Sequence, residues 1–361
     1  MKTKKIRVLV VDDSALMRKI ISDIVCKQDD MELAGTAYDG ENALKKIKLL
    51  SPDVVTMDLE MPKLDGISTL KTIMARDPLP VIIISSYTQR GSEKTMEALI
   101  HGAVDFVAKP LTGIGDTIEE LKKVLPAKIR GASGARLYSG RLRYPGAIPR
   151  KKRGDKQEAE VVVAIGASTG GPRAIEEILK ELPADLPAAT LITQHMPAGF
   201  TASLAQRLDR ISNLAVKEAQ EGDLLLEGEV LIAPGGFHLK VKDRKIVIDS
   251  GCKVNHVRPA VDVMFESLVW LPLPVVAVVL TGMGHDGKKG VQLLKNNKKE
   301  KVIVMAQDPL TSVVKGMPEA VIKTGHCDSI EQLSAMSTQI VNQVYSLKRN
   351  NCKTDTLSDL E

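Results

Sequence analysis

The sequence is poor in aromatic residues and in cysteine, and each shortage excludes a class of function. Phenylalanine, tryptophan and tyrosine make up only 3% of its 361 residues, so the stacked aromatic surfaces that bind single-stranded nucleic acid are not expected. No two cysteines form a C-x-x-C pair, which argues against a structural zinc motif and indicates reduced thiols. The four cysteines are Cys26, Cys252, Cys327 and Cys352.

The sequence also lacks a long hydrophobic run and a strong excess of charge. The apolar run Ile6–Val11 follows a basic start, stops at two aspartates, and is too short for a signal peptide or a membrane span. The formal net charge of +5 is too small for this length to indicate a nucleic-acid partner. We therefore expect a cytoplasmic protein with no nucleic-acid partner and no direct insertion into a membrane.

A chain of this length is too long for one hydrophobic core, which predicts two domains. We place a first domain at residues 1–127, a linker at 128–158, a second domain at 159–350 and a tail at 351–361. The linker is rich in Gly, Arg, Lys and Pro and has no apolar periodicity. Its most basic run is Arg150-Lys151-Lys152-Arg153, which we interpret as solvated chain rather than as a nucleic-acid site or an address signal.

The first domain alternates short apolar runs with helical patterns. This alternation is typical of an α/β fold with a doubly wound parallel sheet. The predicted strands are Ile6–Val11, Met31–Ala37, Val54–Met57, Val81–Ile84 and Ala103–Val107. The predicted helices include Ala15–Val25, Gly40–Leu50 and Thr117–Leu125.

The second domain repeats this alternation and predicts a second doubly wound parallel sheet. Its predicted strands are Val161–Ile165, Ala188–Gln194, Val275–Leu280 and Val302–Ala306. Between residues 214 and 250 the pattern changes to short runs separated by turn residues, which predicts an inserted hairpin region. Those runs are Glu229–Ala233, Phe237–Val241 and Lys245–Ile248. The amphipathic stretch Ile330–Leu347 predicts a closing helix.

Acidic residues follow two predicted strands of the first domain. Asp12 and Asp13 stand where the first strand ends, and Asp58 stands where the third ends. Because the carboxyl ends of parallel strands meet at one edge, we expect these carboxylates to converge and to hold Mg²⁺. Ser85 and Lys109, at the ends of the fourth and fifth strands, would reach the same crevice. The alternative is that Asp12, Asp13 and Ser14 merely cap the first helix, with Asp58 a loop carboxylate and Lys109 a surface cation.

These segments resemble the signature of two-component receiver domains over about residues 5–125. The matching segments are Val10–Ser14, Met57–Gly66 and Val107–Pro110. The resemblance implies a flavodoxin-like fold in which Asp58 accepts a phosphoryl group from a histidine kinase. It also implies that Lys109 pairs with the acyl phosphate and that Ser85 swings to bond it. The Mg²⁺ ligands that it implies are Asp12, Asp13, Asp58 and the backbone carbonyl of Glu60.

The second domain opens with a strand that runs into a turn of small residues, Gly166-Ala167-Ser168-Thr169-Gly170. This G-x-S-x-G pattern either cradles a phosphate or exposes Ser168 as a nucleophile, which would need a base and an orienting acid. His195 directly follows the next strand, and Asp286 stands just past a later one. Strand-end position therefore favours Ser168, His195 and Asp286 as a catalytic set, with His285 as the rival base.

Across about residues 160–345 the second domain resembles the catalytic domain of the chemotaxis methylesterase CheB. The matching segments are Ile165–Pro172, Gln194–Pro197, Phe200–Ala205, Ala233–Gly235 and Leu280–Gly284. The resemblance implies a Rossmann-like esterase domain with the triad Ser168, His195 and Asp286. It implies an oxyanion hole made by the backbone N–H groups of Thr169 and Met283.

The two resemblances together imply a phosphorylation-regulated serine esterase of chemotaxis adaptation. Ser168 would hydrolyse glutamate methyl esters on methylated chemoreceptors, and the same machinery would deamidate selected receptor glutamines. A chemotaxis histidine kinase would be the phosphodonor, Mg²⁺ would serve the receiver, and the esterase reaction would need no cofactor. The unphosphorylated receiver would cover the Ser168 cleft, and phosphorylation of Asp58 would uncover it. One departure is His285, because the family usually has Asn there.

Two hypotheses from other classes stay open. The first is a receiver-controlled binding module whose turn Gly170–Pro172 holds a phosphate or nucleotide, although the turn lacks G-x-G-x-x-G. The second is a DNA-binding response regulator, although no helix-turn-helix pattern is evident and the basic run lies in the linker.

Overall fold

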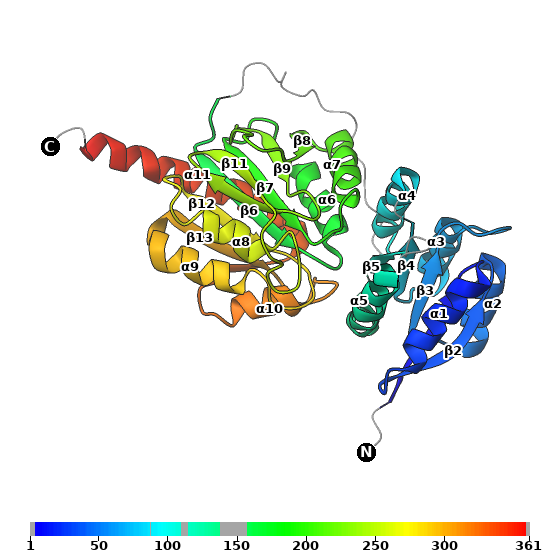
Figure 1. Cartoon of the computed structure of the whole chain (residues 1–361). Coiled ribbons are helices and arrows are strands. Elements are labelled where there is room, and N and C mark those ends of the chain that lie inside the picture. The colour runs from blue at the N-terminus through cyan, green and yellow to red at the C-terminus, as the bar shows by residue number, and fades with distance from the viewer. Residues whose placement is uncertain (1–3, 87, 110–114, 138–156, 359–361) are drawn as a thin grey trace. The chain divides into compact units, whose positions relative to one another are not determined.

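The computed structural model describes the chain apart from residues 1–3, 87, 110–114, 138–156 and 359–361 (Figure 1). The chain divides into two compact units, Met1–Arg141 and Leu142–Glu361. Most of the predicted linker, with its basic run at 150–153, lies outside the described residues. Within the described part of the chain, no helix is both long enough and apolar enough to cross a membrane.

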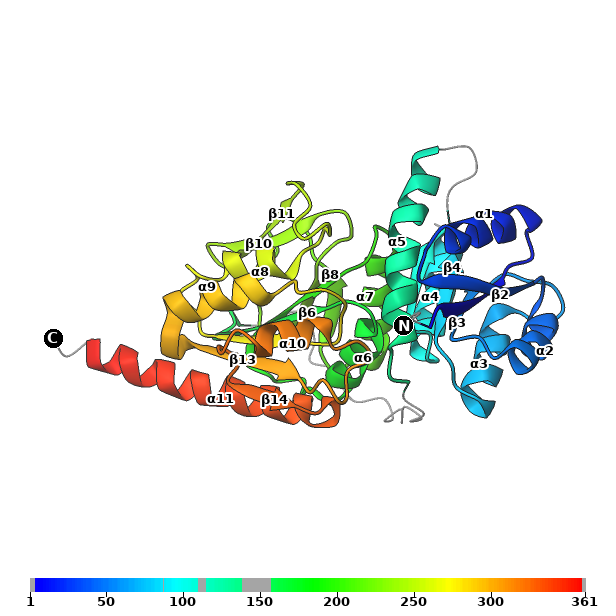
Figure 2. The same ribbon diagram turned by 90° about the horizontal axis from the view of Figure 1, so that it is seen from below.

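The first unit holds a five-stranded parallel sheet with the strand order β2-β1-β3-β4-β5. This confirms the predicted doubly wound sheet, because helices cover both of its faces. Figure 2 shows α1 and α5 on one face and α2 and α3 on the other. The strands are β1 Ile6–Val11, β2 Met31–Ala37, β3 Val54–Asp58, β4 Val81–Ser85 and β5 Asp105–Ala108. The helices are α1 Ala15–Cys26, α2 Gly40–Leu50, α3 Gly66–Arg76, α4 Gln89–Ile100 and α5 Gly115–Ser133.

The last helix of this unit is longer than the sequence predicts. The prediction covers Thr117–Leu125, whereas α5 continues through Pro126 to Ser133. Ile129 and Ala132 are fully buried, so the apolar stripe of the helix extends beyond the proline. Burial of these two side chains stabilises the helix past Pro126. The first residues of the predicted linker are therefore helical.

The second unit holds a seven-stranded sheet with the order β14-β13-β12-β6-β7-β9-β8, parallel throughout. The central strands are continuous buried apolar runs, as expected for a parallel sheet covered on both faces. The strands β8 and β14 were not predicted, because these short, partly exposed edge strands lack that signal. The seven strands are β6 Val161–Ala167, β7 Ala188–Gln194, β8 Ala215–Glu218, β9 Glu229–Ile232, β12 Val275–Val279, β13 Val302–Gln307 and β14 Ser329–Glu331.

The predicted hairpin region is only partly correct. Strand β9 belongs to the main sheet, where it pairs in parallel with β7 and β8. A four-residue apolar run looks the same in a hairpin and in a buried parallel strand, and only its neighbours distinguish them. The other two runs, β10 His238–Lys242 and β11 Lys245–Asp249, do form an antiparallel hairpin. Its turn residues Asp243 and Arg244 have φ values of 51° and 60°, which suit a two-residue turn.

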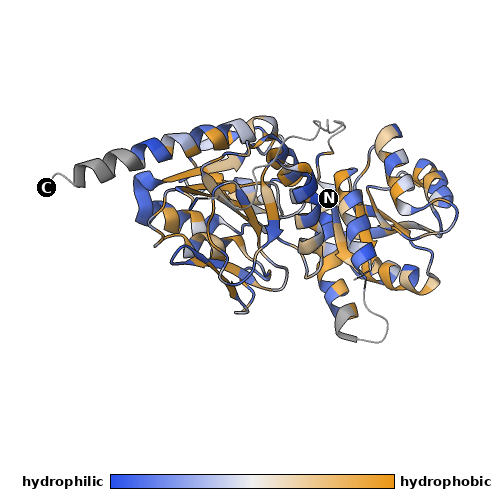
Figure 3. Cartoon of the chain, turned by 90° about the horizontal axis from the view of Figure 1, so that it is seen from above, coloured by the Kyte–Doolittle hydropathy of each residue, from blue (hydrophilic) through white to orange (hydrophobic). Residues whose placement is uncertain are grey.

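Helices cover both faces of the seven-stranded sheet (Figure 1). The helices α6, α7 and α11 lie on one face, where α6 contacts the other two. The helices α8, α9 and α10 lie on the other face, where α9 contacts the other two. Figure 3 shows apolar strands between helices whose polar residues face outward. The predicted closing helix is wrong at its start, because residue 330 lies in the edge strand β14 and the helix begins only at Leu333. The helices are α6 Gly171–Glu181, α7 Phe200–Ile211, α8 Val261–Ser267, α9 Lys288–Lys298, α10 Gly316–Ile322 and α11 Leu333–Ser358.

The strand order places a topological switch point beside β6. From β6 the chain passes first to β7 on one side and later to β12 on the other. In open α/β sheets such a point leaves a crevice at the carboxyl ends of the strands. The segments that follow β6, β7 and β12 therefore meet at one edge of the sheet.

Gly166 in β6 is packed closely against helix α8. A Cβ at this position would lie 2.4 Å from Cγ1 of Val261. Gly166→Ala should therefore lower the free energy of unfolding by about 1–3 kcal/mol, which is the usual effect of overpacking a core. Chemical denaturation of the variant and the wild type measures this difference. Gly134→Ala is the matched control, because nothing lies within 4 Å of a Cβ there. Equal stability of the two variants would contradict this packing.

Candidate active site

Ser168 stands in a tight turn between β6 and α6. Strand β6 ends at Ala167, and α6 begins at Gly171. Gly170 has a φ of +78°, which glycine adopts without steric cost. Gly171 has no room for a side chain, since a Cβ there would lie 2.0 Å from Oε1 of Gln194. The strand–turn–helix context that G-x-S-x-G requires is therefore present.

Strand register brings His195 beside this turn. β6 and β7 pair with Ala167 opposite Gln194, so the next residues along the two strands are Ser168 and His195. The His195 N–H donates to the Ala167 carbonyl at 3.1 Å, and Gln194 Nε2 donates to the Ser168 carbonyl at 2.9 Å. Because neighbouring strands lie about 4.8 Å apart, the side chains of Ser168 and His195 start from adjacent backbone positions.

Asp286 is held by His195 and by a set of backbone donors. Its Oδ2 lies 2.7 Å from His195 Nε2 and accepts from the Val261 N–H at 2.6 Å. Its Oδ1 accepts from the N–H groups of Asp262 and Gly287, both at 3.1 Å. Because Nε2 of His195 faces the acid, Nδ1 is the ring nitrogen left to take a proton from a serine.

The carboxylate of Asp286 is charged throughout the neutral pH range. Burial alone would raise its pKa, but the hydrogen bond and the charge of His195 outweigh burial. Together with the backbone N–H groups of Val261 and Asp262, they lower the pKa of Asp286 to about 2. A permanent negative charge at this place would hold His195 in one orientation and stabilise its protonated ring.

The segment after β12 closes the other side of the serine turn. The Ser168 N–H donates to the Thr281 carbonyl at 3.0 Å, and a Cβ at Gly282 would lie 2.8 Å from the Ser168 Cβ. Met283 comes next, and among the hydrogen bonds of the described residues its N–H donates none, which leaves it available to an oxyanion. The Thr169 carbonyl accepts from Thr281 Oγ1 at 2.9 Å, which fixes the other predicted oxyanion residue.

The rival base His285 is exposed and precedes Asp286 in the chain. Within the described structure, the imidazole that bonds Asp286 is that of His195, and no hydrogen bond joins the His285 ring to this carboxylate. The geometry therefore favours His195 as the base.

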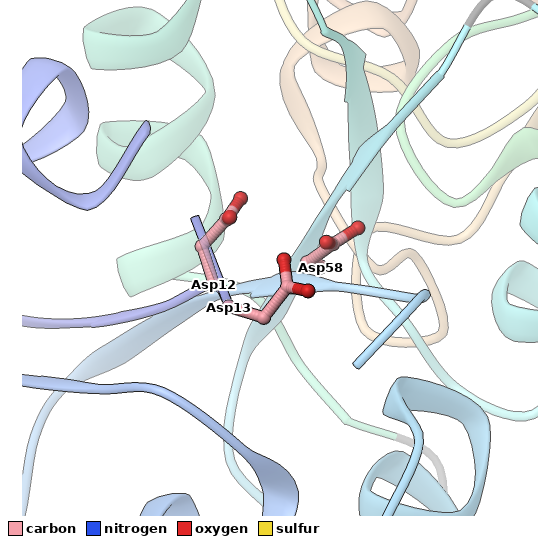
Figure 4. A group of neighbouring side chains, drawn as sticks. All are labelled: Asp12, Asp13 and Asp58. Carbon is pink, nitrogen blue, oxygen red and sulfur yellow. The ribbon is translucent and has the colours of Figure 1, made fainter. Parts of the chain in front are cut away.

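In the first unit, the three predicted aspartates meet at one edge of the sheet. Asp12, Asp13 and Asp58 each place a carboxylate oxygen within 4.8 Å of the others. Figure 4 shows their three side chains as neighbours. Lys109 Nζ lies 2.7 Å from Asp58 Oδ2 and 3.0 Å from Asp12 Oδ2. Burial raises the pKa of Asp58, and the Asp12 charge adds to this effect, whereas Lys109 opposes it.

This cluster suits a hard divalent cation. Three converging carboxylates supply the oxygen ligands that Mg²⁺ prefers, and one lysine cannot neutralise all three charges. Asp12, Asp13 and Asp58 would hold the ion and orient a phosphoryl donor. The bound ion would supply charge neutralisation for phosphoryl transfer.

Of the two remaining predicted receiver residues, Ser85 bonds partners outside the cluster, whereas the backbone of Glu60 bonds Asp58. Ser85 is buried at the end of β4, and its hydroxyl donates to the Gly91 carbonyl at 3.1 Å and accepts from Thr95 Oγ1 at 2.6 Å. The Glu60 N–H donates to Asp58 Oδ1 at 3.3 Å. Ser85 is thus turned toward α4 in this structure rather than toward the carboxylates.

Sequence reasoning missed two residues of the candidate active site. Asn255 Nδ2 lies 2.9 Å from Asp286 Oδ1 and 2.9 Å from Asp262 Oδ2. Neither Asn255 nor Asp262 stands at the end of a predicted strand or in a segment that carries the resemblance. Only the folded chain brings them to Asp286, so no local signal could have identified them.

Comparisons with known proteins cover both units. A family model described as CheB methylesterase matches residues 163–340, and one described as a response regulator receiver domain matches residues 8–121. The protein-glutamate methylesterase/protein-glutamine glutaminase of Symbiobacterium thermophilum is 44% identical, with 94% of this chain and 98% of that protein covered. The protein of the same name from Geobacillus kaustophilus is 45% identical, with 94% and 99% covered.

The crystal structure of the Thermotoga maritima CheB methylesterase catalytic domain is also similar. It is 41% identical, covers 52% of this chain and 100% of that one, and has a TM-score of 0.48. The whole-chain relatives and the two family models confirm both resemblances inferred from the sequence. The chain belongs to the CheB methylesterase family, and a response regulator receiver domain precedes its methylesterase domain.

Proposed function

We propose that this protein is a cytoplasmic, phosphorylation-regulated protein-glutamate methylesterase that also deamidates receptor glutamines. The observation that carries the proposal is the meeting of three strand ends, which sets Ser168 beside His195 and His195 2.7 Å from Asp286. The relatives' names include both activities, and the resemblance to the chemotaxis methylesterase family makes methylated chemoreceptors the proposed substrates. The esterase reaction uses these side chains and needs no cofactor.

In the acylation step, Ser168 Oγ attacks the carbonyl carbon of a glutamate methyl ester. Its proton passes to His195 Nδ1, and the new imidazolium is stabilised by the ionised Asp286. The N–H groups of Thr169 and Met283 would bind the oxyanion. The C–O bond to the methoxy group then breaks, and the proton from His195 leaves with it as methanol.

In the deacylation step, His195 takes a proton from water, and the resulting hydroxide attacks the glutamyl ester of Ser168. Ser168 regains its proton from His195, and glutamate is released. A glutamine side chain would follow the same route, with ammonia in place of methanol as the leaving group. One acyl enzyme therefore accounts for both activities.

We propose that the receiver, residues 1–127, controls this site through Asp58. Its carboxylate oxygen would form a bond to phosphorus as the bond from phosphorus to the kinase histidine breaks, with Mg²⁺ held by Asp12, Asp13 and Asp58. Lys109, already 2.7 Å from Asp58, would then pair with the phosphoryl group. Ser85 would have to leave its α4 partners to reach it, so phosphorylation would shift the receiver toward a second conformation. The family resemblance implies that this second conformation is the one that activates the esterase.

Methanol release from methylated receptor membranes tests this function directly. The full-length protein should release methanol, and acetyl phosphate with Mg²⁺ should increase the rate. No release above the rate without protein, with acetyl phosphate present, would refute the proposal.

Ser168→Ala removes the proposed nucleophile. Methanol release should fall by about 1,000-fold or more, because only oxyanion stabilisation and binding would remain. Phosphoryl uptake at Asp58 from acetyl phosphate should be unchanged. Ser250→Ala, at an exposed serine of the same unit, is the matched control. Retained methanol release in Ser168→Ala would mean that another residue is the nucleophile.

Asp58→Asn removes the proposed phosphoacceptor. Methanol release should lose its stimulation by acetyl phosphate, while the unstimulated rate stays within about twofold of the wild type, because the triad lies in the other unit. Asp29→Asn, at an exposed aspartate of the same unit, should keep the stimulation. Full stimulation of Asp58→Asn would contradict the proposed switch.

The two candidate bases are separated by comparing His195→Ala with His285→Asn. His195→Ala should lower kcat by about 1,000-fold, because no other imidazole bonds Asp286 in the described structure. His285→Asn should change kcat by no more than about threefold, because its ring makes no hydrogen bond to that carboxylate. The reverse order of losses would exchange their roles.

A further inference from the structure

A second buried carboxylate lies directly behind the proposed triad. Asp262, on α8, is only 3% exposed, and its Oδ1 accepts from the Gly290 N–H at 2.8 Å. Its own N–H donates to Asp286 Oδ1 at 3.1 Å, so the two acids are close neighbours. The triad therefore includes only one member of a pair of buried acids.

Two neighbouring buried carboxylates would normally repel each other and share a proton. Burial raises the pKa of Asp262, and the charge of Asp286 raises it further. Among the described residues, His195 bonds Asp286 directly. The Lys289 ammonium pairs with Glu266 at 2.8 Å and also interacts with the negative charge of Asp262. A proton taken up by the pair would therefore go to Asp262, because the pKa of Asp286 stays low.

Asn255 joins these two acids. Its Nδ2 lies 2.9 Å from Asp262 Oδ2 and 2.9 Å from Asp286 Oδ1, so each of its two N–H bonds can donate to a different carboxylate. Oδ1 of Asp286 is thereby fixed, which leaves Oδ2 directed at His195.

The backbone conformation around Asn255 favours an asparagine at this position. Asn255 has a φ of 51°, a left-handed conformation that asparagine tolerates better than most residues. Val254 and Val257 exchange backbone hydrogen bonds of 3.1 and 3.0 Å across it, which closes a tight loop. The loop therefore favours asparagine for its conformation and uses its amide as a double donor.

We propose that Asn255 is a positioning residue of the esterase reaction, whose amide bridges Asp262 and Asp286 and thereby keeps Asp286 aimed at His195. This inference rests on the proposed function, because Asn255 acts through Asp286. It assigns Asp262 the role of anchoring the second N–H of the amide.

Asn255→Asp tests the bridge, because aspartate has the same shape, tolerates the same backbone conformation and replaces the donor by a third acid. At about pH 8, kcat should fall by about 10- to 100-fold, the size of one charge-assisted hydrogen bond, while KM stays within about twofold. The deficit should shrink toward about pH 6, because a carboxyl that gains a proton can again donate one hydrogen bond, to one of the two acids.

Asn255→Gly and Asn296→Asp serve as controls. Glycine keeps the left-handed backbone but lacks the amide, so Asn255→Gly should lose activity by a factor that does not recover at lower pH. Asn296→Asp makes the same chemical change at an exposed site on α9 and should behave as the wild type. If Asn255→Asp has the kcat of the wild type, or if its loss of kcat is the same at all pH values, the proposed role of the Asn255 amide is refuted.

A spectroscopic measurement separates this inference from the proposed function. In protein labelled with ¹⁵N-histidine, the ring proton between His195 and Asp286 should resonate far downfield at neutral pH in the wild type and in Asn296→Asp. In Asn255→Asp this resonance should shift or disappear. An unchanged resonance would refute the positioning role, whatever the esterase activity, whereas a wild type that shows the resonance but hydrolyses no ester would refute only the proposed function.

Discussion

The register between neighbouring parallel strands is the constraint on which the esterase site depends. β6 is hydrogen-bonded to β7 on one side and β12 on the other, so the residues that follow these strands must emerge side by side. Three backbone bonds just past the strands hold this alignment: Ser168 N–H to Thr281, His195 N–H to Ala167, and Leu280 N–H to Gly166. A shift of one residue in either pairing would carry the side chains to the opposite face.

The same constraint serves different chemistry in the receiver. There the ends of β1, β3 and β5 bring Asp12, Asp58 and Lys109 together, and the Lys109 N–H donates to the Ser85 carbonyl at 2.6 Å. Converging charges make a site for a cation and a phosphoryl group, whereas a glycine-rich turn beside an imidazole makes a site for a nucleophile. The sheet positions the groups in both units, and the residue types decide the reaction.

Much of this arrangement could be predicted from the sequence, because strand ends are local features. Apolar runs identified the central strands, and the polar residues directly after them identified Asp58, Ser168 and His195. Strand β9 was misplaced because its partners lie in other parts of the chain, and α5 was cut short because its apolar stripe continues past Pro126. Asn255 escaped prediction because its function depends on contacts with Asp262 and Asp286 that only the tertiary structure creates.

The central claim is that the fold activates a single serine for nucleophilic attack. The most direct measurement is labelling of the native full-length protein with a fluorophosphonate, followed by mass spectrometry of its peptides. We expect one adduct, in which Oγ of Ser168 is bonded to phosphorus with loss of fluoride, and no adduct after denaturation. Release of methanol by a protein that shows no adduct at Ser168, or an adduct at a different serine, would contradict this claim.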